Sequence, residues 1–165
     1  MRCVFDIEAN GLRFWKGEVP PADRVWCGVF YDLDSKEVHK FTPDDLDAMF
    51  AFMRSCTLLI GHNIIDYDLP LVTGLYGITI TECEFVDTYL LSQLLEPDRK
   101  KHPNCPSKKG PHGLDNWGAI FGREKPEHED WSKFSGEMLY RCEQDVVINR
   151  LTYLRLLKEL GEHYA

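Results

Sequence analysis

The apolar positions of the chain fall into short runs that predict strands in its first third. Residues 2–8, 24–32 and 36–42 are apolar or alternate between apolar and polar residues over the length of a strand. The turn-like Asp34-Ser35 leaves only a short link between the second and third runs. Because so short a link cannot cross over a sheet, we expect these two strands to pair antiparallel.

Helix and strand signals then alternate through the middle of the chain. The predicted elements are a helix after Thr42, a strand over 57–61, a helix over 68–76, a strand within 78–86 and a helix over 88–95. Thr42 precedes proline and two acids, which is typical of a helix start. Gly77 ends the second of these helices, and Asp87 is expected to cap the third.

The last third of the chain begins with a long loop and ends in helices. The loop, residues 96–111, carries four prolines and five basic residues. A short amphipathic helix follows over 114–121, and a long one runs from 135 to about 160. This order predicts an α/β fold with a mixed sheet of about five strands, an antiparallel meander joined to parallel strands and flanked by helices.

The composition is that of an ordinary globular protein, with 44% hydrophobic and 28% charged residues. Since we find no internal repeat or linker, residues 1–165 are expected to form a single domain. No apolar run approaches the ~20 residues that span a bilayer, and the chain opens directly into strand-like sequence rather than a signal peptide. We therefore expect a cytoplasmic protein without a membrane partner.

The six cysteines favour free thiols over disulfides. They are widely spaced, form no C-x-x-C pair, and mostly lie within apolar runs. A zinc site built from His102, Cys105 and His112 is the alternative. It is disfavoured because the paired cysteines typical of structural zinc sites are missing.

The net charge of −8 argues against a protein that coats duplex DNA, because such binding is driven by lysine and arginine. An enzyme that grips only the end of a strand is compatible with this charge. A cluster of metal-binding carboxylates would itself add negative charge, which bound cations would neutralise locally.

Carboxylates follow two of the predicted strands. Asp6 and Glu8 lie two residues apart, so both side chains point to one face of the first strand, where they would repel each other if left unneutralised. The alternative is that they only mark the exposed end of that strand. Asp68 follows the strand over 57–61, and two parallel strands deliver their carboxyl ends to the same ligand-binding edge. Asp66, in the same loop, is the alternative candidate for this ligand position, but we favour a solvated loop acid as the interpretation of Asp66.

Asp145 is a further candidate, in the long C-terminal helix. Aspartate is a poor residue for a helix interior, and helical periodicity places Asp145 at the margin of the apolar stripe, facing the sheet. A charge there needs a partner, and a metal ion is a good one. Oxygen ligands alone indicate Mg²⁺ or Mn²⁺ rather than zinc.

Together these segments resemble the proofreading exonuclease domain of family A DNA polymerases, especially the phage replicative type, within the wider DEDD (DnaQ-like, ribonuclease H-like) exonucleases. Asp6-Ile7-Glu8 matches the first motif of that family, D-x-E, and residues 63–68 match the second, N-x₃-[FY]-D. Asp145 matches the last acid of the third motif. Residues 86–92 and 112–118 are similar to the D-T-x-x-L-S and H-x-L-x-x-W-G segments between the motifs. The ordered set spans nearly the whole chain.

The resemblance implies a ribonuclease H-like sheet and a 3′→5′ exonuclease that hydrolyses DNA from the 3′ end to release nucleoside monophosphates. Two Mg²⁺ or Mn²⁺ ions would be held by four acids: Asp6, Glu8, Asp68 and Asp145. Leu12 matches an apolar wedge against the terminal bases, and Asn63 matches a residue that contacts the terminal nucleotide.

The sequence departs from the family in its third motif. The family has a tyrosine four residues before the last aspartate, or a histidine five before it, and this side chain orients the attacking water. Here Arg141 is four residues before Asp145 and Tyr140 is five before it. We favour Tyr140 in this catalytic role, reached through a π-bulge or an irregular turn. The alternatives are that Arg141 contacts the phosphate instead, or that another group orients the water.

Two other groups of residues are candidates for DNA contacts. The aromatic residues Phe14, Trp15 and Trp26 could stack on unpaired bases, although a core role is at least as well supported. The basic residues of the 99–109 loop could grip the phosphate backbone or form solvated surface.

The expected partners are single-stranded DNA or a frayed 3′ end, and a separately encoded DNA polymerase. The alternatives to a DNA exonuclease are an exoribonuclease of the same fold and a non-catalytic nucleic-acid-binding accessory module. The chain is either a separate nuclease or part of a longer polymerase, and a phage origin would place it in the host cytoplasm.

Overall fold

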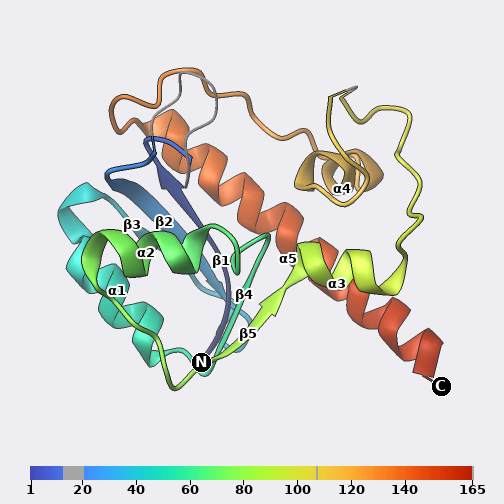
Figure 1. The fold of residues 1–165 in the computed structure, drawn as a ribbon, viewed down its shortest axis with the longest axis horizontal. Helices are drawn as coiled ribbons and strands as arrows, with labels where there is room; N and C mark the ends of the chain where they lie inside the picture. The colour runs from blue at the N-terminus through green and yellow to red at the C-terminus, as the bar shows by residue number, and fades with distance from the viewer. Residues whose placement is uncertain (13–20, 107, 165) are drawn as a thin grey trace.

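A computed structural model describes residues 1–12, 21–106 and 108–164, and a five-stranded mixed sheet lies at its centre (Figure 1). The strands are β1 (Arg2–Ala9), β2 (Val25–Asp32), β3 (Val38–Phe41), β4 (Leu58–Gly61) and β5 (Glu84–Asp87), in the spatial order β3-β2-β1-β4-β5. β2 pairs antiparallel with both β1 and β3, whereas β4 pairs parallel with both β1 and β5. This confirms the predicted α/β fold, in which an antiparallel meander is joined to parallel strands, and it is consistent with a ribonuclease H-like sheet.

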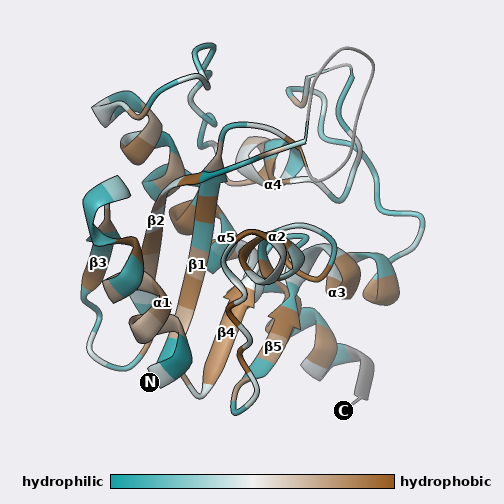
Figure 2. Ribbon diagram, turned by 60° about the vertical axis from the view of Figure 1, so that its left-hand side comes forward, coloured by the Kyte–Doolittle hydropathy of each residue, from teal (hydrophilic) through white to brown (hydrophobic). Residues whose placement is uncertain are grey.

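Helices cover both faces of the sheet (Figures 1 and 2). They are the 3-10 helix η1 (Pro43–Asp45) and the α-helices α1 (Leu46–Ser55), α2 (Asp68–Tyr76), α3 (Thr88–Leu95), α4 (Leu114–Ile120) and α5 (Gly136–Tyr164). α1 and α2 pack against one face and α5 against the other. α3 and α4 pack around the part of α5 that carries Ile148 and Leu156. In the described ranges, no helix has both the length and the apolar character that a membrane span requires.

The alternation of side chains along β1 decides which residues meet which helix. Phe5 is fully buried in the core cluster that contains residues of α1 and α2. Val4 packs instead with Cys142 of α5, in the core cluster on the opposite face. Because side chains alternate along a strand, Asp6 and Glu8 point to the same face as Val4. The two acids are therefore directed toward α5.

Several element boundaries differ from the sequence prediction, those of β5 and α5 among them. β5 occupies only Glu84–Asp87, at the end of the interval in which a strand was expected. α5 extends to Tyr164 rather than to about residue 160, and a Lys158–Glu162 ion pair of 3.7 Å, one turn apart, stabilises its last turns. The six cysteines are all free thiols, as the sequence indicated.

The link from β4 to α2 is held in a tight turn. A Cβ atom at Gly61 would lie 2.0 Å from the Cγ2 of Ile64, so this position requires glycine. Asn63 has a left-handed backbone, with φ 64°, a conformation that asparagine tolerates better than most residues. The carboxylate of Asp87 accepts hydrogen bonds from the backbone N–H groups of Asn63 (2.9 Å) and Ile65 (3.1 Å).

Asp87 also caps α3, as predicted, by accepting hydrogen bonds from the N–H groups of Tyr89 (2.9 Å) and Leu90 (3.3 Å). We expect Asp87→Ala to lower the free energy of unfolding by about 3 kcal/mol, because backbone donors in a largely buried turn lose a charged acceptor. Urea denaturation measures this change. Asp45→Ala is the control, since Asp45 is exposed and its loss should cost about 1 kcal/mol or less. Equal losses for the two variants would contradict the structural role of Asp87.

Candidate metal centre

Carboxylates from two elements converge between the sheet and α5. Asp6 and Glu8 come from β1 and Asp145 from α5, and each offers an oxygen within 4.8 Å of those of the others. The thiol of Cys142 donates to the backbone oxygen of Asp6 (3.3 Å), so α5 is docked directly on this part of β1. Residues far apart in the sequence thus form a compact oxygen-ligand set.

Asp68 adds a fourth carboxylate from the first residue of α2. Its side chain is buried, at 3% exposure, and its charge contributes to raising the pKa of Asp6. The structure therefore places all four predicted acids in one region, with Asp68 beside the three that lie closest together. Asp66, the rival in the same loop, is exposed.

Burial of these like charges raises the pKa values of the four acids. Loss of solvent, followed by the charges of the other acids, raises the pKa of Asp6 well above its usual value. Burial and the nearby Asp145 carboxylate raise the pKa of Glu8 to about 7. Burial is also the main cause that raises the pKa of Asp68 to about 8, and it raises the pKa of Asp145. The acids thus lie together at a free-energy cost that cations would relieve.

Two basic side chains contact the acids. The Nζ of Lys125 is 2.7 Å from Oδ2 of Asp145, and the Nε of Arg141 is 3.3 Å from Oε1 of Glu8. The Asp145 carboxylate holds the pKa of Lys125 above its usual value although burial opposes this. Sequence reasoning missed Lys125, because it lies in a polar loop twenty residues before Asp145 and outside every recognised motif.

The donor set fits divalent cations that prefer oxygen. Among the described residues, Oδ1 of Asp68 and Oδ1 of Asp145 are buried and accept no hydrogen bond. Oε1 of Glu8 is also buried, and its one close basic atom in the described part of the chain is the Nε of Arg141. Buried carboxylate oxygens without donors are costly, and a hard cation such as Mg²⁺ or Mn²⁺ is a suitable partner for them.

The zinc alternative is not supported by the described part of the chain. The acid group is the one set of three or more potential ligands brought together there, and it does not include His102, Cys105 or His112. The Nδ1 atom of His112 is instead hydrogen-bonded to the Ser92 hydroxyl (2.9 Å).

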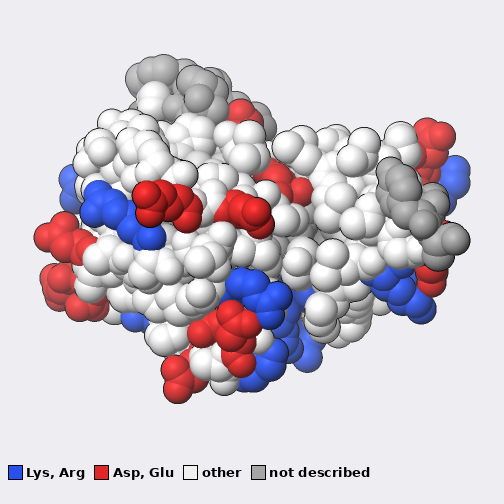
Figure 3. Space-filling model, turned by 90° about the horizontal axis from the view of Figure 1, so that it is seen from below, with Lys and Arg blue, Asp and Glu red and all other residues white. Residues whose placement is uncertain are grey.

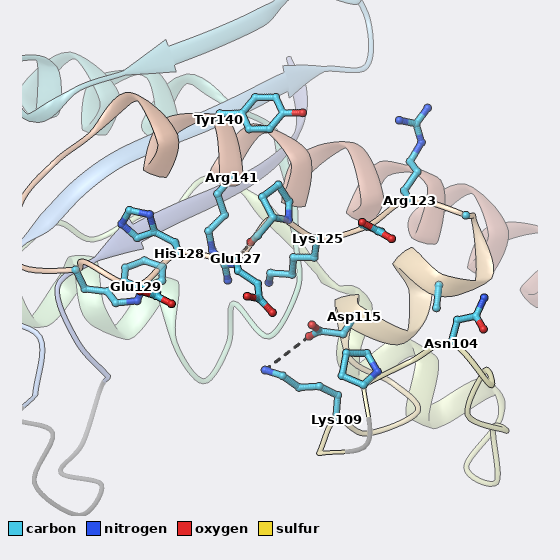
Figure 4. A pocket seen from close by; sticks show the side chains of 16 residues that line it. Asn104, Lys109, Asp115, Arg123, Lys125, Glu127, His128, Glu129, Tyr140 and Arg141 are labelled. Atoms are coloured by element: carbon cyan, nitrogen blue, oxygen red, sulfur yellow. Dashed lines mark hydrogen bonds and ion pairs between the residues drawn. The ribbon is translucent and has the colours of Figure 1, made fainter.

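A groove of about 1010 Å³ opens beside the acids (Figure 4). Its walls come from the loop before α4, from α4, from the 122–131 segment and from the start of α5. None of the four acids lines this groove, but Lys125 and Arg141 line it and also contact Asp145 and Glu8, so the groove lies beside the candidate metal ligands. Lys109 also lines it, whereas Arg99 of the same basic loop is buried against Glu159 (2.6 Å) and has a structural role.

The packing of α5 gives Tyr140 and Arg141 different surroundings, although both line the groove. Cys142 faces the sheet, and Tyr140, two positions earlier, is about 160° away around the helix. Tyr140 is accordingly 55% exposed. α5 is α-helical throughout, so neither the π-bulge nor the irregular turn that would carry Tyr140 to the acids is present. In Figure 4 the Arg141 side chain extends from α5 in a different direction from Tyr140.

Of the other predicted DNA contacts, the structure describes Leu12, just beyond β1, and Trp26, on β2. Leu12 is 41% exposed just beyond β1, and the Tyr67 hydroxyl donates to the backbone oxygen of the neighbouring Gly11, which ties this segment to α2. Trp26 is partly buried and its Nε1 donates to the backbone oxygen of Trp131 (2.9 Å), which supports a packing role. Phe14 and Trp15 lie outside the described residues.

Comparison with known proteins relates the chain to phage DNA polymerases. Over 98% of its length it is 30% identical to the DNA-directed DNA polymerase of Enterobacteria phage T3 and, over the same share, 29% identical to that of Escherichia phage T7. The chain spans 27% of the length of each of these relatives. No protein-family profile matches the chain.

The raised pKa of Glu8 predicts how stability depends on pH. Between its ordinary value of 4.5 and about 7 the folded protein binds more protons at Glu8 than the unfolded chain, so this residue's contribution to stability falls as the pH rises. In EDTA, the free energy of unfolding of Glu8→Gln should therefore rise relative to that of wild type between pH 5 and pH 8, by on the order of 2 kcal/mol. Urea denaturation at both pH values measures it. Glu82→Gln, at an exposed glutamate, should show no such trend.

Proposed function

We propose that this chain is a 3′→5′ exonuclease that hydrolyses DNA one nucleotide at a time with two divalent cations. The observation that carries the proposal is the meeting of Asp6, Glu8 and Asp145 within 4.8 Å, with Asp68 beside them. These are the positions at which the D-x-E, N-x₃-[FY]-D and third motifs match the proofreading exonucleases. The similarity to phage DNA polymerases over 98% of the chain supports DNA as the substrate.

The four acids would hold Mg²⁺ or Mn²⁺, which supplies a water of lowered pKa and stabilises the leaving 3′ oxygen. No side-chain nucleophile is then required. Leu12, exposed just beyond β1, would wedge against the terminal bases, and Asn63, whose backbone N–H is held by Asp87, would contact the terminal nucleotide. The groove beside the acids would receive the end of the strand, with Lys125 and Arg141 on its wall.

A strand end suits the charge distribution better than a duplex. On the face shown in Figure 3, Lys and Arg occur in small groups next to Asp and Glu. An extended basic surface is what binding along duplex DNA would need. A single unpaired strand needs contacts to only a few phosphates and bases.

Because the chain spans 27% of its polymerase relatives, proofreading for a separately encoded or attached polymerase is part of the proposal. That residues 1–165 form a single exonuclease domain remains a prediction. Degradation of RNA by the same acids is a result that the experiment below distinguishes, since discrimination depends on contacts to the 2′ position.

The decisive experiment uses 5′-labelled single-stranded DNA and matched RNA, with Mg²⁺, Mn²⁺ or EDTA. We expect a ladder that shortens from the 3′ end of DNA with either metal and disappears in EDTA. Asp6→Ala should reduce the rate by about 10³-fold or more, because a metal ligand is lost. Asp66→Ala is the matched control and should remain within about threefold of wild type.

An inactive wild-type protein with both metals would contradict the proposal and favour a non-catalytic binding module. A ladder on RNA alone would reassign the substrate.

The third motif provides a separate test. Arg141→Gln should lower kcat/KM by about 10- to 100-fold, because a charged contact to the phosphate is lost. Tyr140→Phe tests the catalytic role that the sequence favoured for Tyr140. Given the exposure of Tyr140, we expect a change of less than about threefold. A large fall in kcat for Tyr140→Phe, with KM unchanged, would restore Tyr140 as the water-orienting residue.

A further inference from the structure

Lys125 is in an unusual position for a lysine. Its side chain is 18% exposed, and its Nζ lies 2.7 Å from an oxygen of Asp145, a proposed metal ligand that is itself 4% exposed. The same lysine lines the groove beside the acids (Figure 4). The ammonium group is thus at the junction between the oxygen-ligand set and the open space in which a strand end would lie.

We propose that Lys125 exchanges partners: it neutralises Asp145 until divalent cations bind, and then turns to a phosphate of the DNA end in the groove. This inference rests on the proposed function, because it assumes that Asp145 is a metal ligand. It assigns Lys125 as a substrate-binding residue that no motif of the sequence identified.

The geometry at Asp145 implies that Lys125 and a divalent cation compete for its carboxylate. Lys125 contacts Oδ2, while Oδ1 is buried without a hydrogen-bond donor. A divalent cation on this carboxylate would lie within a few ångströms of the ammonium group, where repulsion between positive charges in a poorly solvated site is strong. The two cannot be held together at low free-energy cost, so the ammonium group has to leave as the metal enters.

Arg141, the other base in the site, is anchored much more firmly than Lys125. Its guanidinium pairs with Glu8, lies 5.3 Å from the ring centre of Trp131, and donates to the backbone oxygen of Pro126. The last contact fixes the main chain next to Lys125, whose side chain has one ion-pair partner among the described residues, Asp145. The backbone at Lys125 is therefore held while its flexible side chain can rotate into the groove.

Such an exchange couples the two binding events. In the wild type, metal ions free Lys125 for the phosphate, and a phosphate that holds Lys125 leaves Asp145 to the metal. Each ligand should then strengthen the binding of the other by the same factor, as thermodynamic linkage requires.

The test measures binding rather than turnover. Mn²⁺ is titrated calorimetrically into EDTA-treated, dialysed wild type and Lys125→Gln, and then dTMP, the product-like monophosphate, is titrated at saturating Mn²⁺. We expect Lys125→Gln to bind Mn²⁺ about fivefold or more tightly than wild type, because a competing cation is gone. The same variant should bind dTMP about fivefold or more weakly, because a phosphate contact is lost.

Two further variants serve as controls. Lys40→Gln removes the same charge from a lysine that pairs with Glu143 of the same helix (2.8 Å), and both affinities should stay within about twofold of wild type. Lys125→Arg retains the charge and should keep Mn²⁺ affinity within about threefold of wild type. Thermal melting confirms that each variant is folded before it is titrated.

The outcomes separate this inference from the proposed function. If the wild type neither binds Mn²⁺ nor shortens DNA, the proposed function fails and the exchange fails with it. If the wild type does both, but Lys125→Gln binds Mn²⁺ no more tightly, or binds dTMP as tightly as wild type, the exchange alone is overturned. Tighter Mn²⁺ binding by Lys40→Gln to the same degree would also overturn it, since the effect would then come from net charge.

Discussion

Mutual repulsion among buried carboxylates is the constraint on which the candidate site depends. Asp6, Glu8 and Asp145 lie within 4.8 Å of one another because α5 packs on the same face of β1 from which the two strand acids project. Apolar packing between Val4 and Cys142 holds the elements together against this repulsion. A fold can retain such an arrangement where cations, of the protein or of the solvent, neutralise it.

The two basic side chains that contact the acids, Arg141 and Lys125, differ in how firmly the protein holds them. Arg141 is held by Glu8, Trp131 and Pro126, so it is a fixed part of the groove wall. Lys125 depends on Asp145. In the proposed exchange, a fixed base would give the site a defined shape and a movable one would let metal ions replace a protein cation. A protein of net negative charge would in this way bind a negative polymer locally.

The turn at Asp87 links this chemistry to the stability of the fold. Its carboxylate joins the loop after β4, which carries Asn63, to the start of α3. Asp68, the first residue of α2, follows Asn63 closely in the chain. The turn that Asp87 holds therefore also sets the position of the fourth acid. The proposed binding residues and the scaffold therefore share hydrogen bonds, and substitutions here should affect both stability and activity.

The sequence by itself determined the elements and the candidate acids, because these depend on local rules. Alternation in β1 directed Asp6 and Glu8 to one face, and the Asp87 cap marked the start of α3. The tertiary structure alone decided which bases meet the acids. Lys125 reaches Asp145 from a loop with no periodicity or motif.

The rotational setting of α5 was only partly predicted: periodicity directed Asp145 toward the sheet, but it did not place Tyr140 and Arg141 relative to the acids. Arg141 and Asp145 contact or belong to the acid cluster, whereas Tyr140 is exposed on the wall of the groove. The reason is that Cys142 and its apolar neighbours pack on the sheet, and this packing fixes the direction of every other residue of a rigid helix. The motif spacing left Tyr140 and Arg141 as alternatives, because spacing along a chain does not reveal how a helix is turned. The way a helix is turned is decided by burial of its apolar stripe against the sheet, which is a long-range interaction.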